Sequence, residues 1–379
     1  MNDDLTKSLR NLNKLAKWLK KKRVNAGALV LASMEVKFHI DPDTDTVVDI
    51  VAKQHLETMS MVEEFMLLAN VTSAETTLKH FPDCALLRRH PLPPQSNFEP
   101  LLAAAKSQNI HLDVTSNKTL ATSLDNATRE SNPFFNSMLR IMTTRCMMQA
   151  LYFCSGTREP ADYYHYGLAT PIYTHFTSPI RRYADIIVHR LLAVIIEADR
   201  TYPDLLNPKK LADLSQHINY RHKMAQYASR GSAVITAIAS LRGKVSEFDS
   251  YVLFLHKNAI QVLVPTIGQQ LTLYLDSRSN KDKDTKSQAQ KSLQTMEVDE
   301  EKPAPEFEFN EQELYVKCGD VIIRPFDHLR IQVTVDASDV QHQRVVCKLI
   351  TPVIPGFSVP PLEQEDEKRE QKVKKMKKN

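Results

Sequence analysis

The chain has few glycines and few cysteines for its length. Only 8 of its 379 residues are glycine, and neither the dinucleotide-binding fingerprint nor the phosphate-binding loop occurs. Its 5 cysteines include no Cys-x-x-Cys pair, which argues against a structural zinc site and a disulfide framework and favours a reducing compartment. No run approaches 18 apolar residues and residues 1–10 carry no signal-peptide core, so we expect a soluble intracellular protein without a membrane partner.

Opposite charges nearly balance along the chain. Lysine and arginine together number 49, aspartate and glutamate 45, and the net charge is +4. A weakly basic chain permits contact with nucleic acid but does not require it. The composition is 42% hydrophobic and 25% charged, which is typical of a globular protein with one large domain and a smaller one.

The first part of the chain has the periodicity of helices. We expect helices over residues 3–22, 58–80, 98–107, 117–126, 133–151, 179–197 and 209–234. A β-hairpin is expected between the first two, with strands near 35–40 and 47–51. The aspartate-rich segment 41–45 is interpreted as the hairpin turn, because it lacks the glycine and the late acidic residue of a calcium loop.

The last third of the chain changes to short alternating runs. We expect strands at residues 251–255, 259–264, 271–275, 321–323, 329–335 and 345–349, a pattern typical of a small barrel. Residues 276–313 are charged and poor in large aliphatic side chains, which predicts a disordered insertion. A disordered basic tail is expected at 354–379, and its lysine cluster is typical of a nuclear address, a nucleic-acid patch or a solvated tail.

Two adjacent acids interrupt the apolar helix at 58–80. That helix is apolar over most of its circumference, so we expect it to be buried. Glu63 and Glu64 then need charged partners or must face a polar channel.

A serine and a proline precede two arginines at residues 178–182. Ser178 is a good N-cap and Pro179 a good first helical residue. Arg181 and Arg182 would then lie in the first turn, where the helix dipole disfavours cations unless an anion is bound. The alternative is that both arginines pair with acids such as Asp185.

Basic and aromatic residues alternate in the helix that follows. Arg221, Lys223 and Arg230 are interleaved with Tyr220 and Tyr227. This pattern is found where a single RNA strand is gripped and its bases are stacked. A solvated basic face is an equally good interpretation of the spacing.

Four stretches stand in a characteristic order along the chain: MVEEFMLLAN, TRCMMQALYFCSG, HFTSPIRRYADIIVHRLLA and NYRHKMAQYASR. Together they resemble the RNase II/RNase R (RNB) family, and its eukaryotic exosome-associated branch in particular. The resemblance implies a processive, Mg²⁺-dependent 3′-to-5′ exoribonuclease that releases nucleoside 5′-monophosphates in RNA processing and decay. It also implies single-stranded RNA and exosome core subunits as partners, and a location in the nucleus, with the cytoplasm as the alternative.

The resemblance extends to the fold and the domains. It implies a mixed α+β fold, in which residues 1–238 form the C-terminal, largely helical part of an RNB domain. Residues 239–353 would form a small OB-fold β-barrel that carries the insertion 276–313, and residues 354–379 the tail.

The matching motifs also assign roles to single residues. Arg181 corresponds to the arginine near the scissile phosphate and Arg182 lies beside it, so these two are the catalytic candidates. Gln226 stands where bacterial relatives have a glutamate near the RNA 3′ end. The expected RNA-contacting residues are Glu63, Glu64, Ser178, Tyr183, Arg221, Lys223, Gln226 and Arg230.

One part of the family pattern has no match. The aspartate cluster that holds two metals is not found, because only residues 41–49 are dense enough in aspartate and their spacing is wrong. We therefore expect the Mg²⁺ ligands outside this chain, and little exonuclease activity from the chain alone. The chain is then either a fragment of an exoribonuclease or a catalytically inactive RNA-binding or assembly module.

Overall fold

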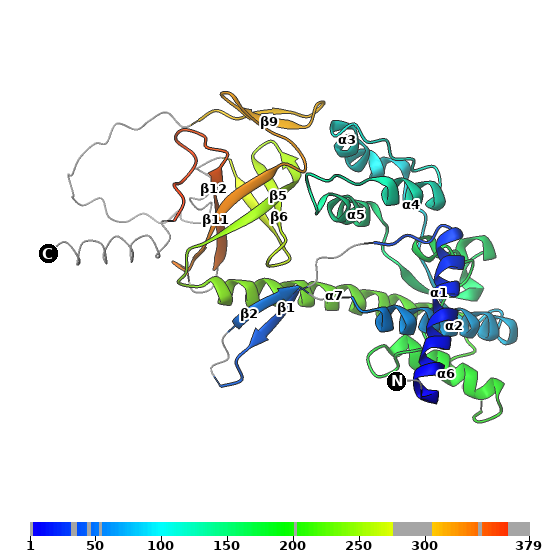
Figure 1. The fold of residues 1–379 in the computed structure, drawn as a ribbon. Helices are drawn as coiled ribbons and strands as arrows, with labels where there is room; N and C mark the ends of the chain where they lie inside the picture. Colours follow the sequence, from blue (N-terminus) through cyan, green and yellow to red (C-terminus); the bar gives the residue numbers. More distant parts are fainter. Residues whose placement is uncertain are drawn as a thin grey trace. The chain divides into compact units, whose positions relative to one another are not determined.

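The computed structural model describes residues 3–31, 36–43, 47–52, 55–200, 203–275, 305–339 and 343–362 (Figure 1). The chain divides into two compact units. Unit 1 comprises Met1–Ser33 and Gln54–Ser232, and unit 2 comprises Met34–Lys53 and Ala233–Asn379. The division falls inside the long helix α7 (Pro208–Leu241), as does the boundary that we expected at residue 238.

Unit 1 is mainly helical. Its other helices are α1 (Asp4–Asn25), α2 (Glu57–His80), α3 (Glu99–Ser107), α4 (Asn117–Asn126), α5 (Phe135–Cys146) and α6 (Tyr183–Ile195), joined by short 3₁₀ turns. Each corresponds to a helix expected from the periodicity. None of the described helices is long and apolar enough to cross a membrane.

A two-stranded antiparallel sheet contributes residues to two core clusters of unit 1. It pairs β3 (Leu86–Arg89) with β4 (Leu151–Cys154). The helix expected over 133–151 is therefore too long, since it ends at Cys146 and its last expected residue begins a strand. Strand geometry points the buried aromatic side chains of Tyr152 and Phe153 to opposite faces of this two-stranded sheet, where each packs in a different core cluster.

Alternation along β3 sends neighbouring side chains to opposite faces. Leu86 packs in a cluster with α6, which includes Ile187, and Leu87 packs in a cluster with Ala74 of α2. Arg88 and Arg89 continue this alternation, so they point to opposite faces of the β3–β4 sheet.

Helix α2 is not buried all round, contrary to the prediction. Val62 is 60% and Leu68 is 46% exposed, while its buried residues are mostly polar. The buried face includes Asn70, whose side chain donates to the hydroxyl of Tyr173 at 2.9 Å. Hydrogen-bond partners across the interface therefore decide which face of α2 is inside, and the apolar composition does not.

Unit 2 contains a five-stranded antiparallel sheet in the order β12-β11-β5-β6-β7. The strands are β5 (Ser246–His256), β6 (Ala259–Val264), β7 (Gln269–Tyr274), β11 (His328–Asp336) and β12 (Arg344–Thr351). The edge strands β12 and β7 also contact each other, so the sheet closes into a small barrel around an apolar core. The expected barrel is confirmed as a five-stranded antiparallel sheet, but the expected strand at 321–323 lies in a separate sheet.

Two smaller sheets accompany the barrel in unit 2. One is the expected hairpin of β1 (Val36–Ile40) and β2 (Val47–Ala52), from which Ile50 packs against the barrel core. The other contains β8 (Glu308–Asn310), β9 (Tyr315–Cys318) and β10 (Val321–Ile323).

Two of the expected disordered segments extend too far. Residues 276–304 and 363–379 lie outside the described residues. Residues 305–313, however, include β8, and Phe307 packs against Phe357 with ring centroids 4.9 Å apart. Ile354 is likewise buried in the barrel core. These few large apolar residues are enough to anchor both segments, which their charged or proline-rich surroundings concealed.

Candidate nucleic-acid site

A cavity of about 650 Å³ in unit 1 is lined by basic, polar and apolar side chains. Its cations are Arg88 on β3 and Lys223 and Arg230 on α7, and no aspartate or glutamate is among its lining residues. Four histidines also line it: His90, His165, His175 and His222. We call this cavity the cation-lined pocket. A concave surface with cations and without carboxylates favours an anionic ligand.

Helix α7 brings three of the expected RNA-contacting residues to this pocket. Lys223, Gln226 and Arg230 are spaced three and four residues apart, so they share one face of the helix. The side-chain amide of Gln226 donates to Nε2 of His222 at 3.2 Å. The ammonium group of Lys223 lies 5.7 Å from the ring centroid of Tyr227, which also lines the pocket. The pocket wall therefore combines cations with an aromatic ring, as sites for single strands do.

Other expected contacts lie away from the pocket. Arg221 is on a different face of α7, where its Nε is 3.5 Å from Nε2 of His217. Tyr183 lines a separate cavity with Arg190. Arg221 and Tyr183 are thus not brought together with Lys223, Gln226 and Arg230.

The sequence interpretation missed two pocket residues, Arg88 on β3 and His165, which precedes the 3₁₀ turn Tyr166–Leu168. Arg88 is 9% exposed, and its guanidinium lies 4.6 Å from the ring centroid of Tyr152. His165 is also buried, and burial, followed by the nearby His90 and Arg88, lowers its pKa to about 3. The only hint in the sequence was a pair of arginines next to two leucines, and nothing in that spacing shows which arginine faces inward.

His90 forms part of the pocket wall with both ring nitrogens occupied. Its Nε2 donates to the carbonyl of Met148 at 2.8 Å, and its Nδ1 accepts from the backbone N–H of Gly167 at 3.0 Å. A Cβ on residue 167 would lie 3.0 Å from that Nδ1. Gly167 therefore allows the close approach that holds His90 as a neutral ring.

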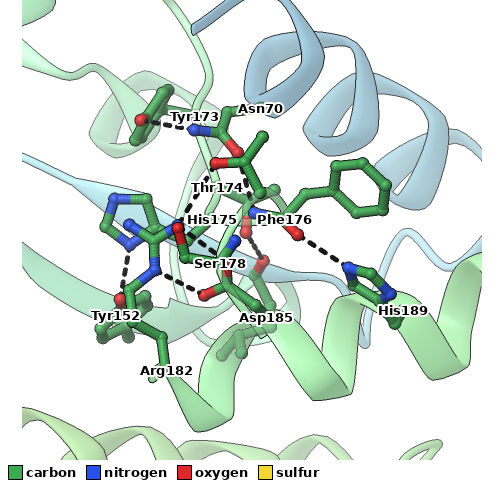
Figure 2. Close-up of polar contacts among 12 residues, drawn as sticks. Asn70, Tyr152, Tyr173, Thr174, His175, Phe176, Ser178, Arg182, Asp185 and His189 are labelled. Atoms are coloured by element: carbon green, nitrogen blue, oxygen red, sulfur yellow. Dashed lines mark hydrogen bonds and ion pairs between the residues drawn. The ribbon is translucent and has the colours of Figure 1, made fainter. Parts of the chain in front are cut away.

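His175 lines the pocket and directly precedes residues 176–182, which we call the arginine segment. Its ring contacts Tyr152 (Figure 2). The hydroxyl of Tyr152 lies 2.5 Å from Nδ1 of His175. Burial, together with the positive charges of Arg88 and Arg182, lowers the pKa of His175 to about 2. The ring is neutral at pH 7, which leaves Nδ1 able to accept from the hydroxyl.

Asp185 holds the arginine segment against α6. It is completely buried and accepts from the backbone N–H of Ser178 at 2.7 Å. It also accepts from Nε and Nη2 of Arg182 at 2.8 and 2.7 Å. Figure 2 shows Asp185 facing both partners from the first turn of the helix. Asn70 Oδ1 and Nε2 of His189 bind the same segment through its backbone, at Phe176.

The expected helix start at Pro179 is wrong. Helix α6 begins at Tyr183, and residues 179–181 form a turn. Ser178 is therefore not the N-cap, because Arg182 occupies that position. Ile180 is 96% exposed and does not join the buried face of α6. The later start follows from the Asp185 carboxylate, which draws the preceding turn back onto the helix.

The two arginines have different surroundings. For Arg182 the structure bears out the alternative of an acidic partner, namely Asp185. Arg181 is exposed, and within the described ranges its side chain has no hydrogen bond or ion pair. The catalytic assignment of both residues remains a prediction.

Glu63 and Glu64 both find a charged partner in α1. The buried carboxylate of Glu64 accepts from Nε and Nη2 of Arg23 at 3.2 and 2.5 Å. Glu63 is 3.7 Å from the same guanidinium. The first of the two expectations, a charged partner, therefore explains these acids in the helix. Their role as RNA contacts remains a prediction.

A magnesium site does not fit the residues that the structure describes. Among them, no group of three or more histidine, cysteine, aspartate or glutamate side chains could hold a metal ion. The cation-lined pocket also lacks carboxylates, which are the ligands that Mg²⁺ prefers.

The model of the RNB domain family matches residues 1–198. The chain belongs to the RNB family. The exosome complex exonuclease RRP44 of Homo sapiens is 48% identical to this RNB chain over 362 residues, which are 95% of the chain and 35% of the human protein. The exosome complex exonuclease dis3 of Schizosaccharomyces pombe is 47% identical over 281 residues, 74% of the chain and 29% of that protein.

A solved structure has the same fold. Mycoplasma genitalium RNase R in complex with ribose methylated single-stranded RNA matches with a TM-score of 0.72 at 20% identity, over 92% of this RNB chain and 51% of that one. At this identity the likeness shows the fold alone. The RNB chain spans 35% of the length of the human relative.

Proposed function

We propose that this RNB chain is part of a 3′-to-5′ exoribonuclease and binds single-stranded RNA in the cation-lined pocket. The observation that carries the proposal is the pocket itself, where Arg88, Lys223 and Arg230 line a cavity that has no aspartate or glutamate among its described lining residues. Each RNA linkage carries a negative charge, so a strand supplies the missing countercharges. Family membership and the names of the RRP44 and dis3 relatives support the exonuclease part of the proposal.

We also propose roles for the residues outside the pocket. Arg181 is exposed beside a well-anchored segment, which suits a cation that contacts the phosphate chain. Arg182 is bound to Asp185, so its part is to orient the segment and to add positive charge near His175. The barrel of unit 2 would act as an OB-type RNA-binding module.

The names of the relatives bear on the partners, and the family resemblance bears on the location. The human and fission yeast proteins are named as exosome complex exonucleases, and we propose exosome core subunits as partners and the nucleus as the location. Hydrolysis itself requires divalent metal, and we propose that its ligands lie outside the residues described here. The described residues supply binding and orientation of RNA.

The alternative is a module that binds RNA or assists assembly without catalysis. It is favoured by the lack of a metal-binding group among the described side chains. Both hypotheses predict RNA binding, and they differ in the activity of the protein that contains the chain.

The test is binding and degradation of 5′-labelled single-stranded RNA by the purified 379-residue chain. We expect an affinity that falls as salt rises, because phosphate neutralisation releases counterions, and no processive release of monophosphates with Mg²⁺. Salt-independent binding or no binding would overturn the RNA part of the proposal. Processive degradation would show that the chain contains the metal site after all.

A further inference from the structure

Arg88 is a buried cation that has no acidic partner among the residues described by the structure. Four other arginines with little exposed side chain each meet a carboxylate; the pairs are Arg23 and Glu64, Arg89 and Asp162, Arg140 and Asp125, and Arg182 and Asp185. The groups that act on the charge of Arg88 are instead two tyrosines and another arginine, Arg182. Burial lowers the pKa of Arg88, as expected for a guanidinium removed from water without a countercharge.

Buried nitrogen atoms without hydrogen-bond partners occur in residues that line the cation-lined pocket. Within the described part of the chain, two buried side-chain nitrogen atoms have no hydrogen-bond partner, Nη1 of Arg88 and Nδ1 of His165. Both residues line the cation-lined pocket. Buried polar groups in native proteins are almost always satisfied, and two exceptions in one cavity indicate that a ligand completes it.

The ring of Tyr152 holds Arg88 in place but does not neutralise it. The guanidinium stacks 4.6 Å from that ring, which occupies one face and leaves the planar edge of the group for other partners. An isolated buried charge is unfavourable, so a cation of this kind is retained where a ligand supplies the opposite charge. Lys223 and Arg230 line the same pocket from α7.

We infer that Arg88 binds one phosphate of the RNA backbone at the wall of the cation-lined pocket. The inference rests on the proposed function and adds to it a specific contact at a residue of β3. A guanidinium fits a phosphate with two parallel hydrogen bonds, which a lysine at this position could not reproduce. The neighbouring His90 and His175 are held neutral by their hydrogen bonds and surroundings, so they leave the charge of the phosphate to the three cations.

Arg89 provides a matched control on the adjacent residue of the same strand. It points to the other face of the β3–β4 sheet, and its Nη1 lies 3.7 Å from Oδ1 of Asp162. Arg88→Met and Arg89→Met therefore remove the same charge on opposite faces and keep an unbranched side chain. We expect Arg88→Met to weaken binding of single-stranded RNA by about 10-fold or more and Arg89→Met to change it less than about twofold.

The contact can be located on the RNA with single neutral linkages. Oligonucleotides that carry one methylphosphonate are bound to the wild-type 379-residue chain and to its Arg88→Met variant. In the wild type, one position should weaken binding more than the others, and in Arg88→Met the same substitution should have no further effect. Arg88→Met should also reduce the slope of log affinity against log salt by about 0.7, the value for one phosphate of a single strand.

The outcomes separate this inference from the proposed function. If the wild type does not bind RNA, the proposed function fails. If the wild type binds and Arg88→Met behaves like Arg89→Met, the Arg88 contact is wrong and the proposed function stands. Circular dichroism checks that the variants are folded. If Arg88→Met does not fold, Arg88→Lys keeps the charge, and we expect weaker binding with the salt slope unchanged; wild-type affinity for Arg88→Lys would overturn the inference.

Discussion

Single buried residues determine much of the chemistry of unit 1. His165 and His175 both line the cation-lined pocket. Burial is the largest cause that lowers their pKa values, to about 3 and about 2, so both rings are neutral at pH 7. Both rings contribute to the pocket as hydrogen-bonding groups without charge.

The same two histidines predict how stability depends on pH. In the unfolded chain each takes up a proton near its ordinary pKa of 6.5. In the folded chain neither does until the pH is much lower, so the unfolded state binds more protons below pH 6.5 and stability falls as the pH falls. At pH 5 each histidine should lower the free energy of unfolding by about 2 kcal/mol.

Urea denaturation at pH 7, 6 and 5, followed by circular dichroism, measures this effect. His165→Gln should lose about half of the dependence between pH 6.5 and pH 5, because one of the two groups no longer titrates. Equal stability at pH 7 and pH 5, or an unchanged slope in His165→Gln, would contradict the neutral assignment.

At the scale of elements, most helices and strands could be predicted from periodicity. Strand β4 and the start of α6 could not. The long helices and the barrel strands were predictable because their apolar spacing repeats over several turns or pairs. Strand β4 was not, since Leu151–Cys154 continues an apolar run that reads equally well as helix. Its pairing with β3, which is distant in the sequence, decides between the two.

The start of α6 was not predictable for a related reason. Ser178 and Pro179 form a good local start signal, but the carboxylate of Asp185 binds both the N–H of Ser178 and the guanidinium of Arg182. Local capping preference is weaker than a buried carboxylate that accepts three hydrogen bonds. The candidate site shows the same limit, because α7 periodicity groups Lys223 with Arg230, whereas Arg88 joins them only through the tertiary fold.

Asp185→Asn tests the anchoring of this element. The substitution leaves the Arg182 charge without its partner, and breaking a buried pair in this way should lower the free energy of unfolding by about 3–5 kcal/mol. Asp204→Asn is the control, because Asp204 pairs with Lys210 at an exposed surface and should cost about 1 kcal/mol or less. Urea denaturation at pH 7 measures both; equal losses would show that Asp185 does not anchor the segment.

At the scale of the whole molecule, the chain consists of two compact units with different architectures. Unit 1 consists of helices and the two-stranded β3–β4 sheet, and unit 2 consists of a barrel and two smaller sheets. The mixed fold was predictable because the sequence changes period after α7. The match to the RNB domain family covers residues 1–198, which contain Arg88 but not Lys223 or Arg230. The pocket therefore combines the matched segment with the helix that follows it.

The most direct measurement is the salt dependence of RNA affinity for two double variants of α7. Lys223→Gln with Arg230→Gln removes two pocket cations, and Lys209→Gln with Lys210→Gln removes two cations elsewhere on the same helix. We predict that the pocket variant binds single-stranded RNA at least about 10-fold more weakly than the wild type, with a salt slope smaller by about 1.4, while the control variant retains wild-type values. Equal effects of the two variants would contradict RNA binding in the cation-lined pocket.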